Sequence, residues 1–168
     1  TSSHFQNIVS VACVVKELDW VSNFMSVYAR HLPVKTREEN IYVAQASIAF
    51  ARKDFHRVIE LTGKPLFKDE IHKFRIRIFQ LRAMYELGLD LTDAFNAYQT
   101  YLLRRRDPVT AYKESAIAFM SVFNMLIQKK VAKKTLSKSL EAYSQIFVRS
   151  WLKDKINTYQ SAIYRRDE

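Results

Sequence analysis

Glycine, proline and cysteine are all scarce in this chain of 168 residues. It contains two glycines, three prolines and one cysteine. A β-rich fold needs turn residues about every eight to twelve positions, and so few glycines and prolines exclude that spacing. An all-α fold needs only a few such residues, so we predict an all-α fold.

Cys13 is the only cysteine, which excludes an internal disulfide, and its apolar neighbours predict a buried thiol. A reducing compartment is the simplest interpretation, and without a signal peptide we expect a cytoplasmic protein. No apolar run reaches the roughly 20 residues that a membrane-spanning helix requires. The chain does not begin with methionine, and we expect it to be a fragment of a longer protein.

Signatures of catalysis and of cofactor binding are missing from the sequence. Isolated glycines cannot form a phosphate-binding loop, and there is no Gly-x-Ser-x-Gly motif. The four histidines lie 27, 25 and 16 residues apart, so no two have the spacing of metal ligands on one helix face. His31 is expected to be a partly buried histidine rather than a ligand. We therefore predict a noncatalytic protein without catalytic residues, metal or cofactor.

The net charge of +10 is unevenly distributed. Residues 1–100 contain 13 Lys and Arg against 11 Asp and Glu, whereas residues 101–168 contain 14 against 6. The C-terminal part therefore carries most of the long-range field. A solvated basic surface explains this balance, and an acidic partner is the alternative.

A helix break recurs along the first hundred residues. The segments 18–20, 53–55 and 89–91 lie 35 and 36 residues apart, each between stretches of helical apolar periodicity. This pattern predicts a stack of antiparallel helical hairpins, because each hairpin needs a neighbour to bury its apolar face. We predict about eight helices in a single helical-repeat domain, with hairpins at 1–35, 36–67 and 68–106 and a helical C-terminal cap at 107–168.

The periodicity also assigns inward faces and helix ends. Thr36 is the expected cap of the third helix. The last apolar pattern, from Leu136 to Ile163, predicts one helix or two with a break near Ser150. The predicted inward residues are Phe5, Ile8, Ala12 and Val15 in the first helix and Trp20, Phe24, Val27 and His31 in the second.

The residues around the breaks resemble tetratricopeptide-like repeats, which implies a right-handed superhelix of helical hairpins. The resemblance covers about residues 5–105, although Lys53 and Leu89 replace the usual turn glycine. The matching residues are Ala46, Ala49, Phe50, Asp54, Phe55 and Val58 around the second break, and Leu81, Tyr85, Asp90, Leu91 and Ala94 around the third.

A closer resemblance extends further along the chain. The runs LRAMYELG at 81–88, YLLRR at 101–105 and WLKDK at 151–155 look like a family of tetratricopeptide-like proteins of unassigned function that is common in Bacteroidetes. This resemblance implies the C-terminal end of a longer α-solenoid. It implies no chemistry, because the family carries no established activity.

Three functions remain open. The first is a noncatalytic protein-interaction or scaffolding module that docks a protein, a peptide or the remainder of its own chain on an apolar inner face. The chain's own C-terminal helix is the alternative occupant of that face. The second is a basic helical-repeat module that contacts nucleic acid or another polyanion. The third is a structural end of a larger α-solenoid with no ligand of its own.

Each of the first two functions has its candidate residues. The inner face of the first helices supplies Val43, Ser47, Phe50, Phe79 and Glu86. If helical, Lys130, Lys134 and Lys138 share one face at a spacing of four residues. The polyanion-binding candidates are these three lysines together with Arg104, Arg105 and Arg106.

Overall fold

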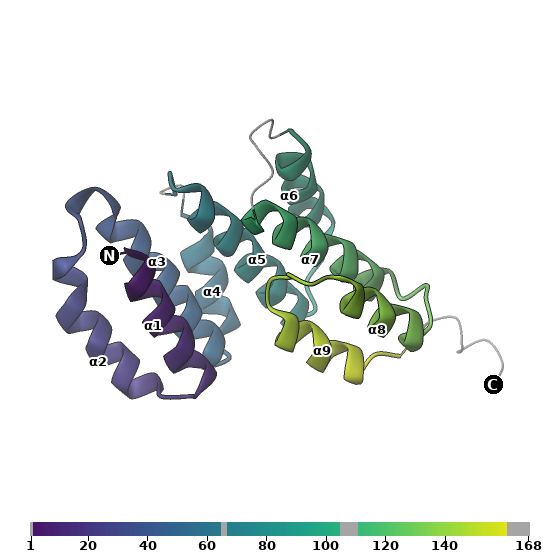
Figure 1. Cartoon of the computed structure of the whole chain (residues 1–168), viewed down its shortest axis with the longest axis horizontal. Coiled ribbons are helices and arrows are strands. Elements are labelled where there is room, and N and C mark those ends of the chain that lie inside the picture. Colours follow the sequence, from purple (N-terminus) through teal and green to yellow (C-terminus); the bar gives the residue numbers. More distant parts are fainter. Residues whose placement is uncertain (1, 65–66, 105–110, 161–168) are drawn as a thin grey trace. The chain divides into compact units, whose positions relative to one another are not determined.

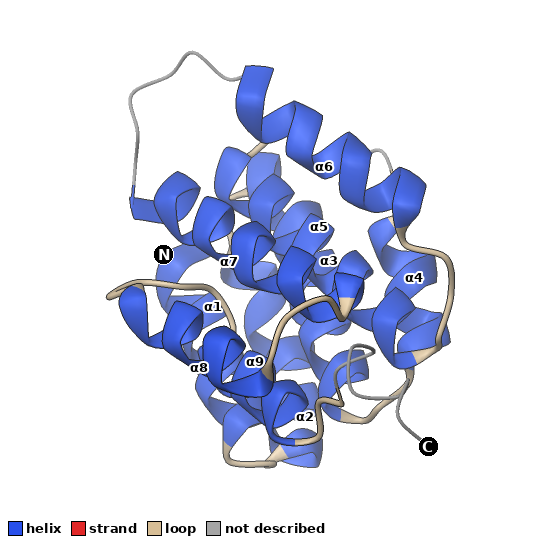
Figure 2. Cartoon of the chain, turned by 90° about the vertical axis from the view of Figure 1, so that its right-hand side faces the viewer, coloured by secondary structure: helices blue, strands red, loops and turns tan. Residues whose placement is uncertain are grey.

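The chain folds entirely into helices and connecting loops over the residues described by this computed structural model, which are 2–64, 67–104 and 111–160 (Figure 1). No strand occurs among these residues (Figure 2), so the all-α prediction is confirmed. The helices are α1 (Ser2–Val14), α2 (Leu18–Tyr28), the 3-10 helix η1 (Ala29–His31), α3 (Val34–Ala51), α4 (Phe55–Thr62), α5 (Glu70–Glu86), α6 (Thr92–Arg104), α7 (Ala111–Gln128), α8 (Lys133–Ala142) and α9 (Arg149–Asn157).

Two compact units make up the chain, residues 1–98 and residues 99–168. In the first unit α3 packs against α1, α2, α4 and α5, and α4 also packs against α5. In the second unit α8 packs against both α7 and α9. The single helical-repeat domain over residues 1–168 stays a prediction.

Three helices of the first unit end in the same backbone motif. A residue with left-handed φ follows each helix, and the next residue donates its backbone N–H to a carbonyl five residues earlier, as in the Schellman motif. These closures lie 37 and 35 residues apart, and they set the register of the repeat. The left-handed residues are Lys16 (64°), Lys53 (61°) and Gly88 (66°), and the closing bonds are Glu17 to Ala12 (2.9 Å), Asp54 to Ala49 (2.9 Å) and Leu89 to Met84 (3.0 Å).

In this register α3 has two packing faces. Its front face contacts α4 and α5, and its back face contacts α1. Ala44 and Ile48, on the back of α3, join the core formed by the front of α1. Phe79 and Ala83, at the same repeat positions on α5, join the core formed by the front of α3. The front-face residues are Phe5, Val9 and Ala12 on α1 and Tyr42, Ala46 and Ala49 on α3.

The predicted inward faces of α1 and α2 are only partly confirmed. Phe5 and Ala12 are buried and Phe24 is half-buried, but the other five predicted inward residues are exposed. The buried stripe of α1 is rotated from the prediction because it faces α2 and α3 together, and on α2 only Val21 is fully buried. The exposed residues are Ile8, Val15, Trp20, Val27 and His31.

Buried polar groups join successive hairpins. The Gln6 side-chain amide donates to the backbone carbonyl and to Oδ1 of Asn40, at 2.8 and 3.1 Å. The Glu39 carboxylate accepts the backbone N–H groups of Lys68 and Asp69, both at 3.0 Å, and lies 3.3 Å from Nδ1 of His72. Glu39 therefore binds the chain entering α5, where four backbone N–H groups lack partners within the helix.

Thr36 does not cap α3, contrary to the prediction. The helix begins two residues earlier, at Val34, directly after Pro33. The Thr36 hydroxyl instead lies 3.3 Å from the hydroxyl of Ser2 on α1. It thereby contributes to the contact between the first two hairpins.

The second unit has a core of large apolar side chains from α7, α8 and α9. Leu126, Leu136 and Leu152 are all fully buried. The Tyr159 hydroxyl donates to the carbonyl of Val131 at 2.8 Å. The segment with the last apolar pattern forms two helices, α8 and α9, which is one of the two predicted alternatives. The break between them lies at residues 143–148 rather than near Ser150, and its last residue, Val148, has a φ of 50°.

Candidate functional site

The predicted inner-face residues lie on α3 and α5, and their exposure differs. Val43 is fully buried in the core between α3, α4 and α5, so its side chain offers no surface to a partner. Ser47, Phe50, Phe79 and Glu86 are half-buried. Partner binding by these four residues stays a prediction.

An arginine fills the space beside two of these residues. The guanidinium carbon of Arg82 lies 3.8 Å from the ring centre of Phe50 and 5.6 Å from that of Phe79. Burial lowers the pKa of Arg82 to about 9, while the charge of Glu86 acts in the opposite direction. The side chain therefore stays protonated at neutral pH and forms a cation–π contact with Phe50.

The predicted polyanion-binding residues do not form one stripe. Lys134 and Lys138 are exposed one turn apart on α8, but Lys130 precedes that helix, in the connection from α7. Arg104 is exposed at the end of α6. Arg105 and Arg106 lie outside the described residues.

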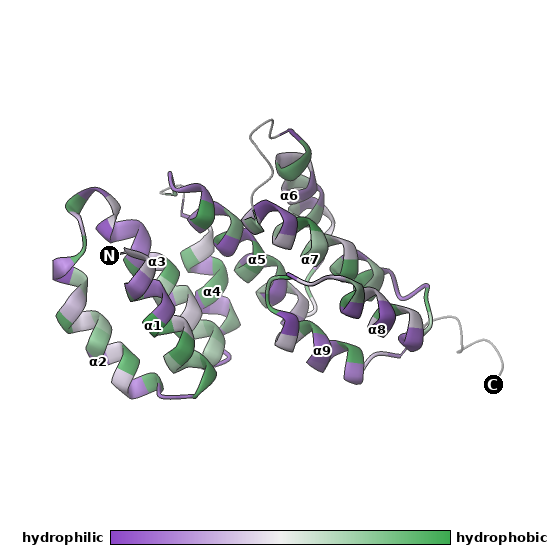
Figure 3. Ribbon diagram, viewed as in Figure 1, coloured by the Kyte–Doolittle hydropathy of each residue, from purple (hydrophilic) through white to green (hydrophobic). Residues whose placement is uncertain are grey.

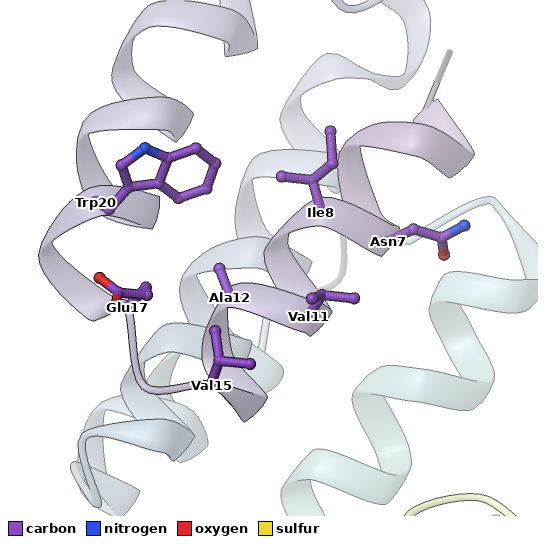
Figure 4. Close-up of a pocket in the computed structure, with 7 residues that line it drawn as sticks. All are labelled: Asn7, Ile8, Val11, Ala12, Val15, Glu17 and Trp20. Carbon is purple, nitrogen blue, oxygen red and sulfur yellow. The ribbon is translucent and has the colours of Figure 1, made fainter.

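The structure shows an apolar groove between α1 and α2 that the sequence analysis did not predict. Five residues of α1 and the α1–α2 turn, with Glu17 and Trp20, line an open hollow of about 570 Å³. Ile8 of α1 and Trp20 of α2 point toward one another (Figure 4). The lining residues, here called the α1–α2 groove, are Asn7, Ile8, Val11, Ala12, Val15, Glu17 and Trp20.

Large apolar side chains surround this groove and remain in contact with water. The exposed fractions are 62% for Val11, 59% for Val15 and 52% for Trp20. Figure 3 shows the hydrophobic colouring on the part of α1 that leads into the α1–α2 turn. Trp20 is held in place by stacking on Phe24, with ring centres 5.3 Å apart. Exposed apolar side chains gathered in this way are typical of interaction surfaces.

The sequence carries a signal for the groove, because Ile8 and Val15 fit the predicted inward stripe but are exposed and line the groove. Val11 is apolar in addition to the buried Val9 and Ala12, so α1 is apolar on more than one side. A helix with two apolar sides needs two neighbours. In the structure α1 packs against α2 and α3 on one side only.

The only thiol of the chain is not activated. Cys13 is half-buried, and burial raises the pKa of its thiol to about 11, opposed by the charge of Arg52, so the thiol is protonated at neutral pH. His31 is exposed, contrary to the prediction, whereas His72 is buried beside Glu39. Among the described residues no three His, Cys, Asp or Glu side chains are close enough to hold a metal ion.

The first unit is thus an all-α stack of helices in repeat register, with an exposed apolar surface on its first hairpin. Comparisons with protein-family models, with curated proteins and with solved structures find no match to this chain. No helix within the described ranges has the length and apolarity needed to cross a membrane.

Proposed function

We propose that this chain is a noncatalytic protein-interaction module of the tetratricopeptide-like kind, and that its docking site is the α1–α2 groove. The observation that carries the proposal is the set of apolar side chains that α1 and Trp20 leave exposed around one hollow. An amphipathic helix is the partner that such a groove suits, because its apolar face covers side chains spaced three and four residues apart.

The repeat register supports this choice of site over the predicted inner face. The groove side of α1 includes Asn7 and Val11, whose repeat equivalents on α3 are Ala44 and Ile48. Both of those α3 residues are buried against α1. The inner face of α3 and α5 is already occupied by Phe50, Phe79 and Arg82 in mutual contact.

A selection from displayed amphipathic peptides tests this function with the full chain as bait. Helical peptides that bind should lose affinity for Val11→Glu, because the new carboxylate loses its hydration in an apolar contact. The matched control is Val34→Glu, since Val34 is 81% exposed and lies outside the groove. Binding should be insensitive to salt. Peptides that bind both variants equally, or no peptides at all, would contradict the proposal.

Polyanion binding is a second candidate function, favoured by the exposed pair Lys134 and Lys138 on α8. Two like charges one turn apart repel each other, and a bound polyanion relieves that repulsion. Affinity for a single-stranded oligonucleotide should then fall steeply as salt rises. It should also fall in the double variant Lys134→Glu, Lys138→Glu. The matched control is Lys35→Glu with Lys64→Glu, which changes the net charge equally at exposed positions of the first unit.

A further inference from the structure

A row of aromatic rings runs along α2 from the α1–α2 groove toward η1. The ring centres of Trp20 and Phe24 lie 5.3 Å apart, and those of Phe24 and Tyr28 lie 4.8 Å apart. Phe5 of α1, which is buried, stacks on Phe24 at 5.6 Å and fixes the row to the core. We call Trp20, Phe24 and Tyr28 the aromatic row. Because Trp20 also lines the α1–α2 groove, the groove and the aromatic row form one continuous surface.

The aromatic row is exposed, although it belongs to a stripe that the sequence predicts to face inward. Trp20, Val27 and Tyr28 are exposed, and only Phe24 packs against the core. From Trp20 to Tyr28 the row extends about 12 Å along the helix axis, which is about two helical turns. Apolar side chains three and four residues apart on one helix pack against a helix with the same spacing. The aromatic row therefore extends the surface on which a partner helix can lie.

Two arginines lie at the η1 end of the aromatic row. The rings of Tyr28 and His31 have centres 6.1 Å apart, and Nε of Arg30 donates to Nε2 of His31 at 3.4 Å. Arg37 of α3 reaches the same corner and donates to the backbone carbonyl of Arg30 at 2.8 Å. Among the described residues neither arginine forms an ion pair, although Glu38 directly follows Arg37 in the sequence. A carboxylate of a partner is the group that complements this corner.

The groove end of the surface has no such excess of positive charge. Glu17 lines the groove, and Lys16 is its neighbour in the turn. Asp19, at the start of α2, pairs with Arg52 at 3.3 Å. Cations and carboxylates therefore balance near Trp20, whereas cations predominate near Tyr28. A partner that fits both ends has its negative charge at one end only.

Exposed aromatic rings beside arginines can also bind single-stranded nucleic acid, by stacking on its bases. Here the rings of the aromatic row already stack on one another, so a partner meets mainly their edges. At the groove end the carboxylate of Glu17 repels phosphate groups. Both observations favour a helix with a charged end over a strand that is negative along its whole length.

We infer that the partner is an amphipathic helix that lies along the α1–α2 groove and the aromatic row and places a carboxylate beside Arg30 and Arg37. This inference rests on the proposed function, because it extends the same docking surface and names the charge of its partner. The apolar contacts supply the affinity, and the exposed ion pair selects among helices and fixes which end of the helix lies at η1.

A selection of displayed amphipathic helices with randomised residues at both ends of the apolar stripe tests the inference. The full wild-type chain as bait should enrich Asp and Glu at one end of the stripe. The bait Arg30→Glu should lose that enrichment and favour Lys and Arg at the same end. Lys64→Glu is the matched control, because it changes the net charge equally at an exposed residue outside this surface, and it should enrich the same helices as the wild type.

The affinity of one selected acidic peptide measures both parts of the contact. Arg30→Glu should weaken binding by about fivefold, the range expected of one exposed ion pair. Replacing the carboxylate of the peptide by an amide should weaken binding to the wild type and not to Arg30→Glu. Tyr28→Ala should weaken binding by about tenfold, since it removes an aromatic contact. Circular dichroism checks that each variant folds.

A wild-type selection without acidic enrichment, or an affinity that Arg30→Glu and Tyr28→Ala both leave unchanged, would overturn the inference. If Val11→Glu still abolishes binding in that case, the proposed function stands with a site confined to the α1–α2 groove. Binding that none of the three variants changes would overturn both proposals. Tighter binding of a single-stranded oligonucleotide than of any selected peptide, lost in Arg30→Glu, would replace the helix by nucleic acid.

Discussion

The junction between α1 and α3 and the junction between α3 and α5 pack in the same register but use different polar groups. At the first junction the Ser2 and Thr36 hydroxyls meet at 3.3 Å, and Gln6 binds Asn40. At the second, the position equivalent to Ser2 is Glu39, a buried carboxylate that binds two backbone N–H groups. One repeat geometry thus accommodates a junction whose buried polar groups are neutral and one with a buried carboxylate, and the two differ in how they respond to mutation and pH.

The two junctions should differ most in the free energy of unfolding that is lost when a polar group of each is removed. Glu39→Ala leaves the backbone N–H groups of Lys68 and Asp69 and the ring of His72 without their common acceptor. We expect the free energy of unfolding to fall by about 2–4 kcal/mol. Ser2→Ala removes one half-buried neutral contact and should cost under about 1 kcal/mol. Urea unfolding of both variants measures the difference, and equal losses would contradict the comparison.

Acid should weaken the Glu39 contacts of the second junction and leave the neutral Ser2–Thr36 and Gln6–Asn40 contacts of the first unchanged. Burial by itself raises the pKa of Glu39, but the N–H groups of Lys68 and Asp69 and the ring of His72 outweigh it, so the pKa lies below its ordinary value of 4.5. A depressed folded-state pKa stabilises the fold at pH values above the unfolded-state pKa, and this contribution is lost as pH falls through the folded-state pKa.

Glu39→Gln isolates this effect because its side chain does not titrate. The stability difference between wild type and Glu39→Gln should be largest near neutral pH and shrink below pH 4.5. Urea midpoints across that range measure it. A difference that is constant with pH would show that Glu39 is not the group responsible.

Substitutions at the left-handed residues that follow α1, α3 and α5 should change the free energy of unfolding by about 1 kcal/mol, which is less than the change expected for Glu39→Ala. Lys16 and Lys53 hold the left-handed conformation that Gly88 adopts freely. Lys16→Gly and Lys53→Gly should each raise the free energy of unfolding by about 1 kcal/mol, and Gly88→Ala should lower it by a similar amount. A Cβ at Gly88 meets no atom within 4 Å, so only backbone conformation is changed. Thermal melts of the three variants measure these shifts, and a destabilised Lys53→Gly would contradict the equivalence of the closures.

Helix existence and fold class could be predicted from the sequence, because apolar periodicity and the scarcity of turn residues are local properties. The orientation of α1 could not, since its apolar residues occupy two sides and the periodicity does not say which side has a neighbour. The repeat spacing of 37 and 35 residues could not be predicted either. The aspartates near the helix breaks predict spacings of 35 and 36 residues. The left-handed residues that end α1 and α3 are lysines, a residue type that does not by itself indicate a left-handed conformation.

The sequence indicates which kind of site to expect, an apolar surface, but not where on the fold it lies. An apolar interaction surface was expected on the inner face, but Val43 is in the core and Phe50 and Phe79 contact each other and Arg82. Burial of this kind depends on which helices lie next to each other, which no single stretch of sequence determines. The groove on α1 depends on the same property, because the equivalent back faces of α3 and α5 are covered by neighbouring helices whereas Asn7 and Val11 of α1 are exposed.

The smallest effect on stability, and the sharpest test of the open surface, comes from giving α1 the cation of α3. Val15→Arg reproduces Arg52 at its repeat-equivalent position, where the native side chain is 59% exposed. In the unbound chain the change should shift the free energy of unfolding by no more than about 0.5 kcal/mol, because the new charge stays in water. A saturating helical peptide selected for binding should stabilise the wild type and stabilise the variant less, because the arginine must lose its hydration in the apolar contact. Thermal melts with and without the peptide separate the two cases, and an equal rise in melting temperature for both proteins would contradict docking at the α1–α2 groove.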